Sequence, residues 1–175
     1  MSEINIPCIV KPNNGGSSIG VSKVNHIYDL ENKIKIAFKE CNEVLIEDFL
    51  FGKEVSVGVI QKKNERIILP VTEIISENEL FDYEAKYLGQ STEITPANIS
   101  NEEINLIHKY INIVYDNIEF NGFTRSEFII VDGIPHILET NTIPGFTKQS
   151  IIPQQIEAHG LSVRDEINYQ IESIL

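Results

Sequence analysis

The residues of this chain that are best suited to chemistry lie in one stretch, Gly122–Ser150, with the sequence GFTRSEFIIVDGIPHILETNTIPGFTKQS. Strand-like runs flank an Asp132-Gly133 turn in this stretch, which is the pattern of an apolar hairpin. Paired strands of such a hairpin have no structural need for an arginine, two glutamates and an asparagine, yet these residues are present. A conflict between local pattern and residue choice is typical of a functional site. The residues concerned are Arg125, Glu127, Glu139 and Asn141.

The length of the hairpin loop decides whether these side chains share a face, because side chains alternate along a strand. A two-residue loop would send the two glutamates to opposite faces. We predict an odd loop, Asp132–Ile134, since three-residue loops with a glycine bulge are common. That loop pairs Glu127 with Glu139. It also pairs Arg125 with Asn141.

This predicted pairing suits a hard metal ion. Two carboxylates would lie ~5 Å apart across the ladder, which is costly unless a cation lies between them. Carboxylate and amide oxygens, without Cys or His, favour Mg²⁺ or Mn²⁺ over zinc or copper. Phosphate oxygens commonly complete the shell of Mg²⁺. Arg125 beside such a site is placed to stabilise a transferring phosphoryl group or a developing anion.

The segment after the hairpin suits anion binding. Gly145, in a Pro144-Gly145 bend, brings a bare backbone N–H near the same place, and Ser150 is expected to cap the helix that follows. A helix start of this kind is a ready site for a carboxylate. The alternative interpretation of the hairpin and this segment is a buried ion-pair network without a functional role.

Charge and composition exclude several classes of protein. The net charge is -12, from 14 Lys and Arg against 26 Asp and Glu. Such an acidic chain has no electrostatic reason to bind nucleic acid or an anionic membrane surface. No apolar run approaches the ~20 residues of a membrane span. The two cysteines form no metal or disulfide pattern, which favours reduced thiols and a cytoplasmic location.

The first part of the chain offers a candidate nucleotide site. Pro7–Pro12 and Gly20–Val24 are expected to pair as strands around a Gly/Ser loop, with Lys11 at the end of the first strand. Backbone N–H groups of glycines and the hydroxyls of Ser17 and Ser18 suit a phosphate lid. The alternative is an ordinary mobile turn.

Three further strands are expected to form one antiparallel sheet: Glu43–Phe49, Lys53–Gln61 and Arg66–Ile75. Carboxylates cluster around the first turn between them. They are either solvated strand ends or contacts to the edge of a purine and its ribose. The carboxylates are Glu47, Asp48 and Glu54.

Helical spacing of apolar residues predicts helices over Tyr28–Cys41, Asn101–Asn117 and Ser162–Leu175, the second with Ser100 as its N-cap. The segment Ser76–Pro96 has no regular pattern. A loop of that length is usually a lid or a disordered segment, and its aromatic residues argue against disorder. Lys86 within it is either a phosphate contact or a lysine on a surface loop.

Several segments of the chain together resemble the D-alanine–D-alanine ligases, a family of the ATP-grasp superfamily. The resemblance implies an α+β (α/β) ATP-grasp fold of antiparallel sheets flanked by helices. Residues 1–51 would form the end of the central lobe, with the ATP lid and adenine strand, and residues 52–175 the C-terminal lobe, with the metal and substrate site. The N-terminal substrate domain of the family is expected to be missing. The segments, in the order of the family, are PCIVKPNNGGSSIGVSKV, EVLIEDFLFGKEVSV, FDYEAKY, TRSEF and LETNTIPGFTKQSIIPQ.

The resemblance also implies a role for each candidate residue. ATP would contact Lys11, Ser17, Ser18 and Lys86 through its phosphates, and Glu47, Asp48, Leu50 and Glu54 through its adenine and ribose. Two Mg²⁺ (or Mn²⁺) ions would be bound by Glu127, Glu139 and Asn141. Arg125 and the Gly145 N–H would stabilise oxyanions, Ser150 and the Ile151 N–H would hold the carboxylate of the second D-alanine, and Tyr87 would close its loop onto the N-terminal domain. Glu127 departs from the family, which commonly has Asp at this position.

The activity implied is ATP-dependent joining of two D-alanines for peptidoglycan, hence for cell-wall biogenesis and cell shape. ATP phosphorylates the first D-alanine carboxylate, and the amine of the second attacks the acyl phosphate. The expected partners are the missing N-terminal domain and a second copy in a homodimer, and the isolated chain is expected to have little ligase activity. The alternatives are another ATP-grasp carboxylate–amine ligase and a non-catalytic nucleotide-binding piece.

Overall fold

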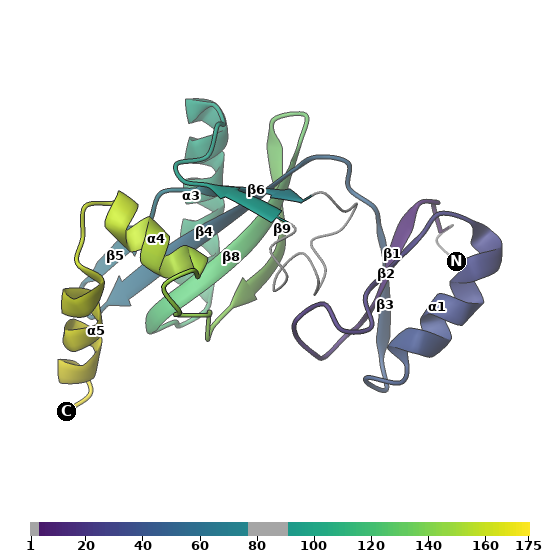
Figure 1. Cartoon of the computed structure of the whole chain (residues 1–175), viewed down its shortest axis with the longest axis horizontal. Helices are drawn as coiled ribbons and strands as arrows, with labels where there is room; N and C mark the ends of the chain where they lie inside the picture. Colours follow the sequence, from purple (N-terminus) through teal and green to yellow (C-terminus); the bar gives the residue numbers. More distant parts are fainter. Residues whose placement is uncertain (1–3, 77–90) are drawn as a thin grey trace. The chain divides into compact units, whose positions relative to one another are not determined.

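The computed structural model describes residues 4–76 and 91–175, and they form two units (Figure 1). The first contains the residues up to Phe51 together with Ser76, Ser91 and Thr92, and the second contains Gly52–Ile75 and Glu93–Leu175. None of the helices in these described ranges combines the length and apolar character that a bilayer crossing needs.

The first unit is a small sheet with one helix packed on it. Strands β1 (Cys8–Pro12), β2 (Ser22–Val24) and β3 (Val44–Asp48) are antiparallel in the order β2-β1-β3. Alternate residues of β1 face helix α1 (Leu30–Ala37), which follows the short helix η1 (Ile27–Asp29). The core between sheet and helix consists of Cys8, Val10, Val24 and Ala37.

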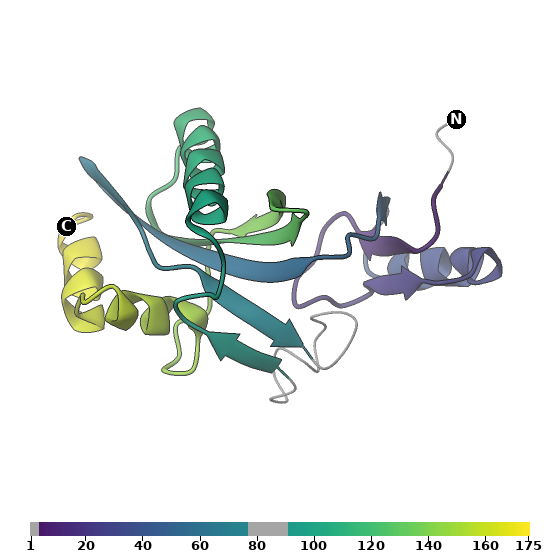
Figure 2. The same ribbon diagram turned by 90° about the horizontal axis from the view of Figure 1, so that it is seen from above.

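The second unit is a six-stranded sheet covered on both faces. The strand order is β7-β6-β4-β8-β9, and β5 pairs with β4 beside this path. Figure 2 shows helices α3 and α4 on opposite sides of β4. The strands are β4 (Lys53–Lys62), β5 (Glu65–Ile68), β6 (Thr72–Ser76), β7 (Ser91–Ile94), β8 (Gly122–Val131) and β9 (Ile134–Asn141), and the helices are α3 (Asn101–Asn117), α4 (Ile151–Ala158) and α5 (Val163–Glu172).

Alternation along β4 separates two cores in this unit. The odd-numbered valines Val55, Val57 and Val59 pack with Phe128 against α3. The even-numbered side faces α4, where Ile60 and Leu69 pack with Ile152 and Ile156. Since strand β8 lies next to β4, its residues are divided between the same two faces.

The structure corrects three sequence expectations. Glu43–Phe49 does not pair with the strand after it, because β3 finds its partner in β1, with Cys8 opposite Asp48. The predicted strand Arg66–Ile75 is two strands, since Pro70 has no N–H to continue a ladder. The segment Ser76–Pro96 contains strand β7, which extends the sheet at its edge.

The predicted start of helix α3 is confirmed. Ser100 Oγ accepts from the Glu103 N–H at 3.2 Å, and the Glu103 carboxylate accepts from the Ser100 N–H at 2.7 Å, a reciprocal capping box.

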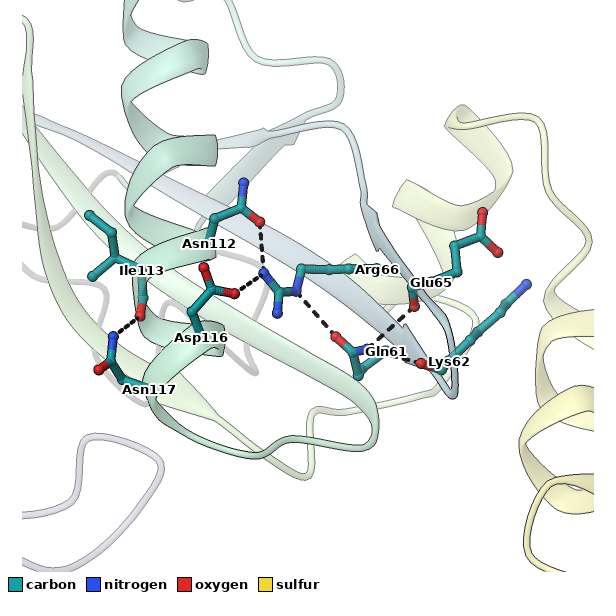
Figure 3. Close-up of polar contacts among 8 residues, drawn as sticks. All are labelled: Gln61, Lys62, Glu65, Arg66, Asn112, Ile113, Asp116 and Asn117. Carbon is teal, nitrogen blue, oxygen red and sulfur yellow. Dashed lines mark hydrogen bonds and ion pairs between the residues drawn. The ribbon is translucent and has the colours of Figure 1, made fainter.

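Farther along α3, Arg66 of β5 connects the helix to the sheet (Figure 3). Its Nη1 donates to Asn112 at 2.8 Å and pairs with Asp116 at 3.1 Å.

Helix α4 is fixed to the sheet by one buried glutamine. Gln155 Oε1 accepts from the Gly58 N–H at 2.8 Å. Its Nε2 donates to the Ser56 carbonyl and to Thr72 Oγ1, both at 2.9 Å. A Cβ on Gly58 would lie 2.5 Å from Gln155 Oε1 and 2.6 Å from Ile152 Cδ1. The absence of a side chain at residue 58 therefore permits α4 to pack this closely.

We predict that Gly58→Ala lowers the free energy of unfolding by about 1–3 kcal/mol, the usual cost of overpacking a core. Chemical denaturation with circular dichroism measures the change. Gly16→Ala is the matched control, because a Cβ there meets no heavy atom within 4 Å. Equal stability of the two variants would contradict the packing argument.

Candidate functional site

The turn of the β8–β9 hairpin has two residues, so the predicted three-residue loop is wrong. Val131 pairs with Ile134 across the turn. Asp132 has φ 49° and Gly133 has φ 78°, and a type I′ turn requires φ > 0 at both positions. Asp-Gly suits this turn, and its twist matches that of the strands.

The predicted cross-strand pairs are nevertheless confirmed, because a β-bulge in β9 produces the same pairing. The ladder shifts register between Glu127 and Phe128. Phe128 pairs with Ile137, whereas Glu127 pairs with Glu139, which leaves Leu138 as an extra residue in β9. This β-bulge supplies the odd residue that the turn does not. Two residues farther along β8, Arg125 pairs with Asn141.

Arg125 and Glu127 form a close ion pair on the α4 face of the sheet. Arg125 Nη2 lies 2.6 Å from Glu127 Oε1, and the side chains are 14% and 5% exposed. Gly58 and Ser56 of β4 lie opposite these two residues. Arg125 Nε is buried without a hydrogen-bond partner among the described residues. The pair is therefore desolvated, but one guanidinium nitrogen is unsatisfied.

The other two candidates on β9 are more accessible. Glu139 is exposed and Asn141 is half-buried. Asn141 Oδ1 accepts from the Ile143 N–H at 2.9 Å, which starts the turn out of the strand. Within the described residues no group of three or more His, Cys, Asp and Glu could hold a metal. The predicted ligand set of two carboxylates and an amide thus leaves most positions around an ion to other oxygens.

Ser150 lies at the N-cap of α4 as predicted, but its side chain makes no capping hydrogen bond. The expected cap is wrong in that respect. The third residue of the helix is Pro153, which has no N–H to donate. Ser150 Oγ instead accepts from the Thr147 N–H at 3.0 Å. A Cβ on Gly145 would lie 3.1 Å from the same oxygen, so the structure brings Gly145 and Ser150 together.

Two polar residues beside this cluster escaped the sequence analysis, Glu93 of β7 and Gln154 of α4. Gln154 Nε2 donates to Glu93 at 3.3 Å and to the Gln149 carbonyl at 2.9 Å. Burial raises the pKa of Glu93, while the hydrogen bond from Gln154 and the charge of Arg125 act in the opposite direction. The alternation of Ser91–Ile94, STEI, was the only available signal for the strand that carries Glu93.

In the first unit, the nucleotide candidates lie on the sheet and its connections. Lys11 Nζ is 2.5 Å from Glu47. These residues are diagonal neighbours, because Ile9 lies opposite Glu47 and Lys11 opposite Leu45. The Asp48 carboxylate accepts from Asn5 at 3.3 Å.

Positive φ angles mark the candidate lid, 55° at Ser17 and 57° at Ser18. Leu50 belongs to the first unit, and Glu54 belongs to the second. On β4, Glu54 has the same parity as Ser56 and so shares a face with Glu127. The candidates Lys86 and Tyr87 lie outside the described residues.

Comparisons with known proteins show which family this chain resembles. A family model described as D-ala D-ala ligase C-terminus matches residues 1–172. A D-alanine–D-alanine ligase of Flavobacterium johnsoniae is 52% identical over 98% of this chain and 53% of its own length. The solved VanG D-Ala:D-Ser ligase of Enterococcus faecalis has a TM-score of 0.84 at 31% identity, over 98% of this chain and 50% of that one. A Bacillus anthracis D-alanine–D-alanine ligase complexed with ATP has a TM-score of 0.78 at 25% identity, over 99% and 56%.

The fold is thus that of the ATP-grasp proteins, antiparallel sheets with helices, as the sequence predicted. The chain belongs to the D-alanine–D-alanine ligase family and corresponds to its C-terminal portion. It spans about half the length of the curated relatives that it matches.

We predict that Arg125→Met destabilises the second unit by about 3 kcal/mol, because it leaves the buried Glu127 carboxylate without its counter-charge. Replacing both residues with methionine restores much of the loss, since no uncompensated charge then remains. Urea unfolding measures both changes.

The matched control is Lys35→Met, which breaks the exposed 2.6 Å pair with Glu31. Exposed pairs of this kind contribute only a few tenths of a kcal/mol, roughly 0.3–0.5. An equally small loss for Arg125→Met would contradict the inference that the Arg125–Glu127 pair is desolvated.

Proposed function

We propose that this chain is the Mg-ATP-binding and acceptor-binding part of a D-alanine–D-alanine ligase. In this reaction, ATP phosphorylates the carboxylate of one D-alanine, and the amine of a second D-alanine attacks the acyl phosphate. The dipeptide would serve peptidoglycan synthesis in the cytoplasm. Membership of a family of ligases supports the proposal.

The single observation that carries the proposal is the pairing in the bulged hairpin. Glu127 lies opposite Glu139, and Arg125 lies opposite Asn141. The bulge at Leu138 costs regular ladder hydrogen bonds, and its effect is to put these polar residues on one face. A hairpin with only a structural role would gain nothing from that register.

The donor set fits Mg²⁺ or Mn²⁺. Glu127, Glu139 and Asn141 offer hard oxygens, and Glu127 retains one carboxylate oxygen beyond its 2.6 Å contact with Arg125. We propose that these residues hold two ions. Bound ions would neutralise phosphate charge and polarise the transferred phosphoryl group.

The residues around the metal ligands would act on anions. Arg125 is held in position by Glu127, so its guanidinium is preorganised toward a developing negative charge. The Gly145 N–H would assist it. Ser150 and the Ile151 N–H would hold the acceptor carboxylate, since the helix start has no side-chain cap to compete with a ligand.

Most of the proposed nucleotide contacts belong to the first unit. Lys11 is now paired with Glu47, and phosphate oxygens would draw its ammonium away. Glu47, Asp48, Leu50 and Glu54 would contact the adenine and ribose, and Ser17, Ser18 and Lys86 the phosphates. Tyr87 would close its loop. The solved relative that is complexed with ATP supports ATP as the nucleotide.

The acceptor and partners are also proposals. D-alanine is favoured by the curated relatives of Flavobacterium johnsoniae, Christiangramia forsetii and Bacteroides fragilis, which are D-alanine–D-alanine ligases. D-serine is the second candidate, because the solved VanG ligase resembles this chain with a TM-score of 0.84. The remaining partners proposed are the N-terminal part of a complete ligase and a second copy in a homodimer. Nucleic acid and membrane are not expected as partners.

We predict that the chain binds Mg-ATP in titration calorimetry and that Glu139→Gln weakens this binding by at least about tenfold, the scale of one lost charged contact. The substitution removes the charge of the carboxylate that lies opposite Glu127. Leu138→Ala is the matched control, because it keeps the bulge and both carboxylates. Unchanged affinity in Glu139→Gln would refute the metal and phosphate site.

We further predict ATP- and D-alanine-dependent phosphate release when this chain is joined to the N-terminal part of the Flavobacterium johnsoniae relative, and little release from the chain alone. D-serine and D-lactate in place of D-alanine test the acceptor. Release that is independent of any amino acid, or strong release from the 175-residue chain by itself, would contradict the proposal.

A further inference from the structure

Glu93 is a half-buried carboxylate that the proposed reaction has not used. It lies on β7, in the second unit, and accepts one hydrogen bond of 3.3 Å from Gln154 Nε2. Among the described residues it takes part in no ion pair. A carboxylate that has lost water normally recovers the cost through a cation and several donors. Within the described part of the chain, the hydrogen-bond donor to the Glu93 carboxylate is the neutral amide of Gln154, at 3.3 Å.

The nearby cation is already engaged. The charge of Arg125 lowers the pKa of Glu93, but Arg125 Nη2 is already paired with Glu127 at 2.6 Å. Burial raises the pKa of Glu93 more than the hydrogen bond from Gln154 and the charge of Arg125 lower it. The site therefore favours the arrival of a further positive group.

Gln154 connects Glu93 to the acceptor end of the site. The same Nε2 that donates to Glu93 also donates to the Gln149 carbonyl at 2.9 Å, and residue 149 directly precedes Ser150. The carboxylate is thus held beside the segment where Ser150 and the Ile151 N–H are proposed to bind an acceptor carboxylate. An α-amino acid presents its carboxylate and its ammonium on one carbon, so one molecule could contact an anion-binding segment and a carboxylate held beside it.

We propose that Glu93 binds the ammonium group of the acceptor amino acid and thereby selects an amine over a hydroxyl. This assignment rests on the proposed function, and it adds a specificity-determining residue to it. An ammonium brings three donors and a full charge, which satisfy the carboxylate better than a neutral amide does. A hydroxy acid would bring one neutral donor and leave Glu93 under-satisfied.

The test measures binding of D-alanine and D-lactate to the 175-residue chain with Mg²⁺ and a non-hydrolysable ATP analogue. Glutamate labelled with ¹³C at its carboxyl reports Glu93 by NMR. We expect Glu93→Gln to weaken D-alanine binding about tenfold or more, the scale of a lost charged hydrogen bond. D-lactate binding should change little. The Gln side chain keeps an oxygen acceptor for Gln154, so the fold should persist, which thermal unfolding checks.

A second readout separates recognition from a structural role. D-alanine should lower the pKa of Glu93, because an opposite charge favours the carboxylate, and D-lactate should not. The matched control is Glu157→Gln, an identical charge change at an exposed position of α4.

Three outcomes would overturn the assignment: no D-alanine binding by the wild type, equal losses for D-alanine and D-lactate in Glu93→Gln, or loss of Mg²⁺ binding in that variant. Titration of the analogue on the same samples keeps the two ideas apart. If the analogue binds but D-alanine does not depend on Glu93, the inference fails and nucleotide binding stands. If the analogue does not bind either, the proposed function fails as well.

Discussion

The buried charge pair of Arg125 and Glu127 is the interaction on which the rest of the second unit depends. Taking a guanidinium and a carboxylate out of water is favourable only when their geometry is tightly held. β4 lies beside them with Gly58 and Ser56, and Gln155 occupies the space that a larger residue 58 would take. The close packing of α4 therefore depends on the absence of a side chain at residue 58. Arg125 lies opposite that residue, so its orientation depends on the same packing.

The α4 face of the sheet carries three carboxylates in different surroundings. Glu127 is neutralised by its neighbour, Glu139 lies exposed across the ladder, and Glu93 is half-buried beside α4. Like charges on one face repel one another unless cations lie between them. We propose that two of these carboxylates bind metal ions and that one binds an ammonium, so the ligands of the proposed reaction would bring positive charge to this face.

Much of this arrangement could be predicted from sequence because it is local. Near neighbours in the sequence decide three features: the polar pairs of the hairpin, the N-cap at Ser100 and the β1–β2 pairing. What failed depended on distant partners or on backbone detail. Strand β3 pairs with β1 and not with the strand that follows it. The extra residue of the hairpin is Leu138 in β9, whereas the sequence analysis placed it in the turn. Glu93 was missed because its hydrogen bond from Gln154 joins strand β7 to helix α4, and this contact between distant segments cannot be read from the sequence.

The division of labour between turn and bulge has a consequence for how this hairpin can change. The type I′ turn only reverses the chain, while the bulge next to Glu127 sets which face each side chain of the β9 end occupies. Any even change in length at the hairpin tip, one residue added or removed on each strand, leaves that parity intact. The tip of the hairpin can therefore change in length during evolution, while the reactive half keeps its alignment.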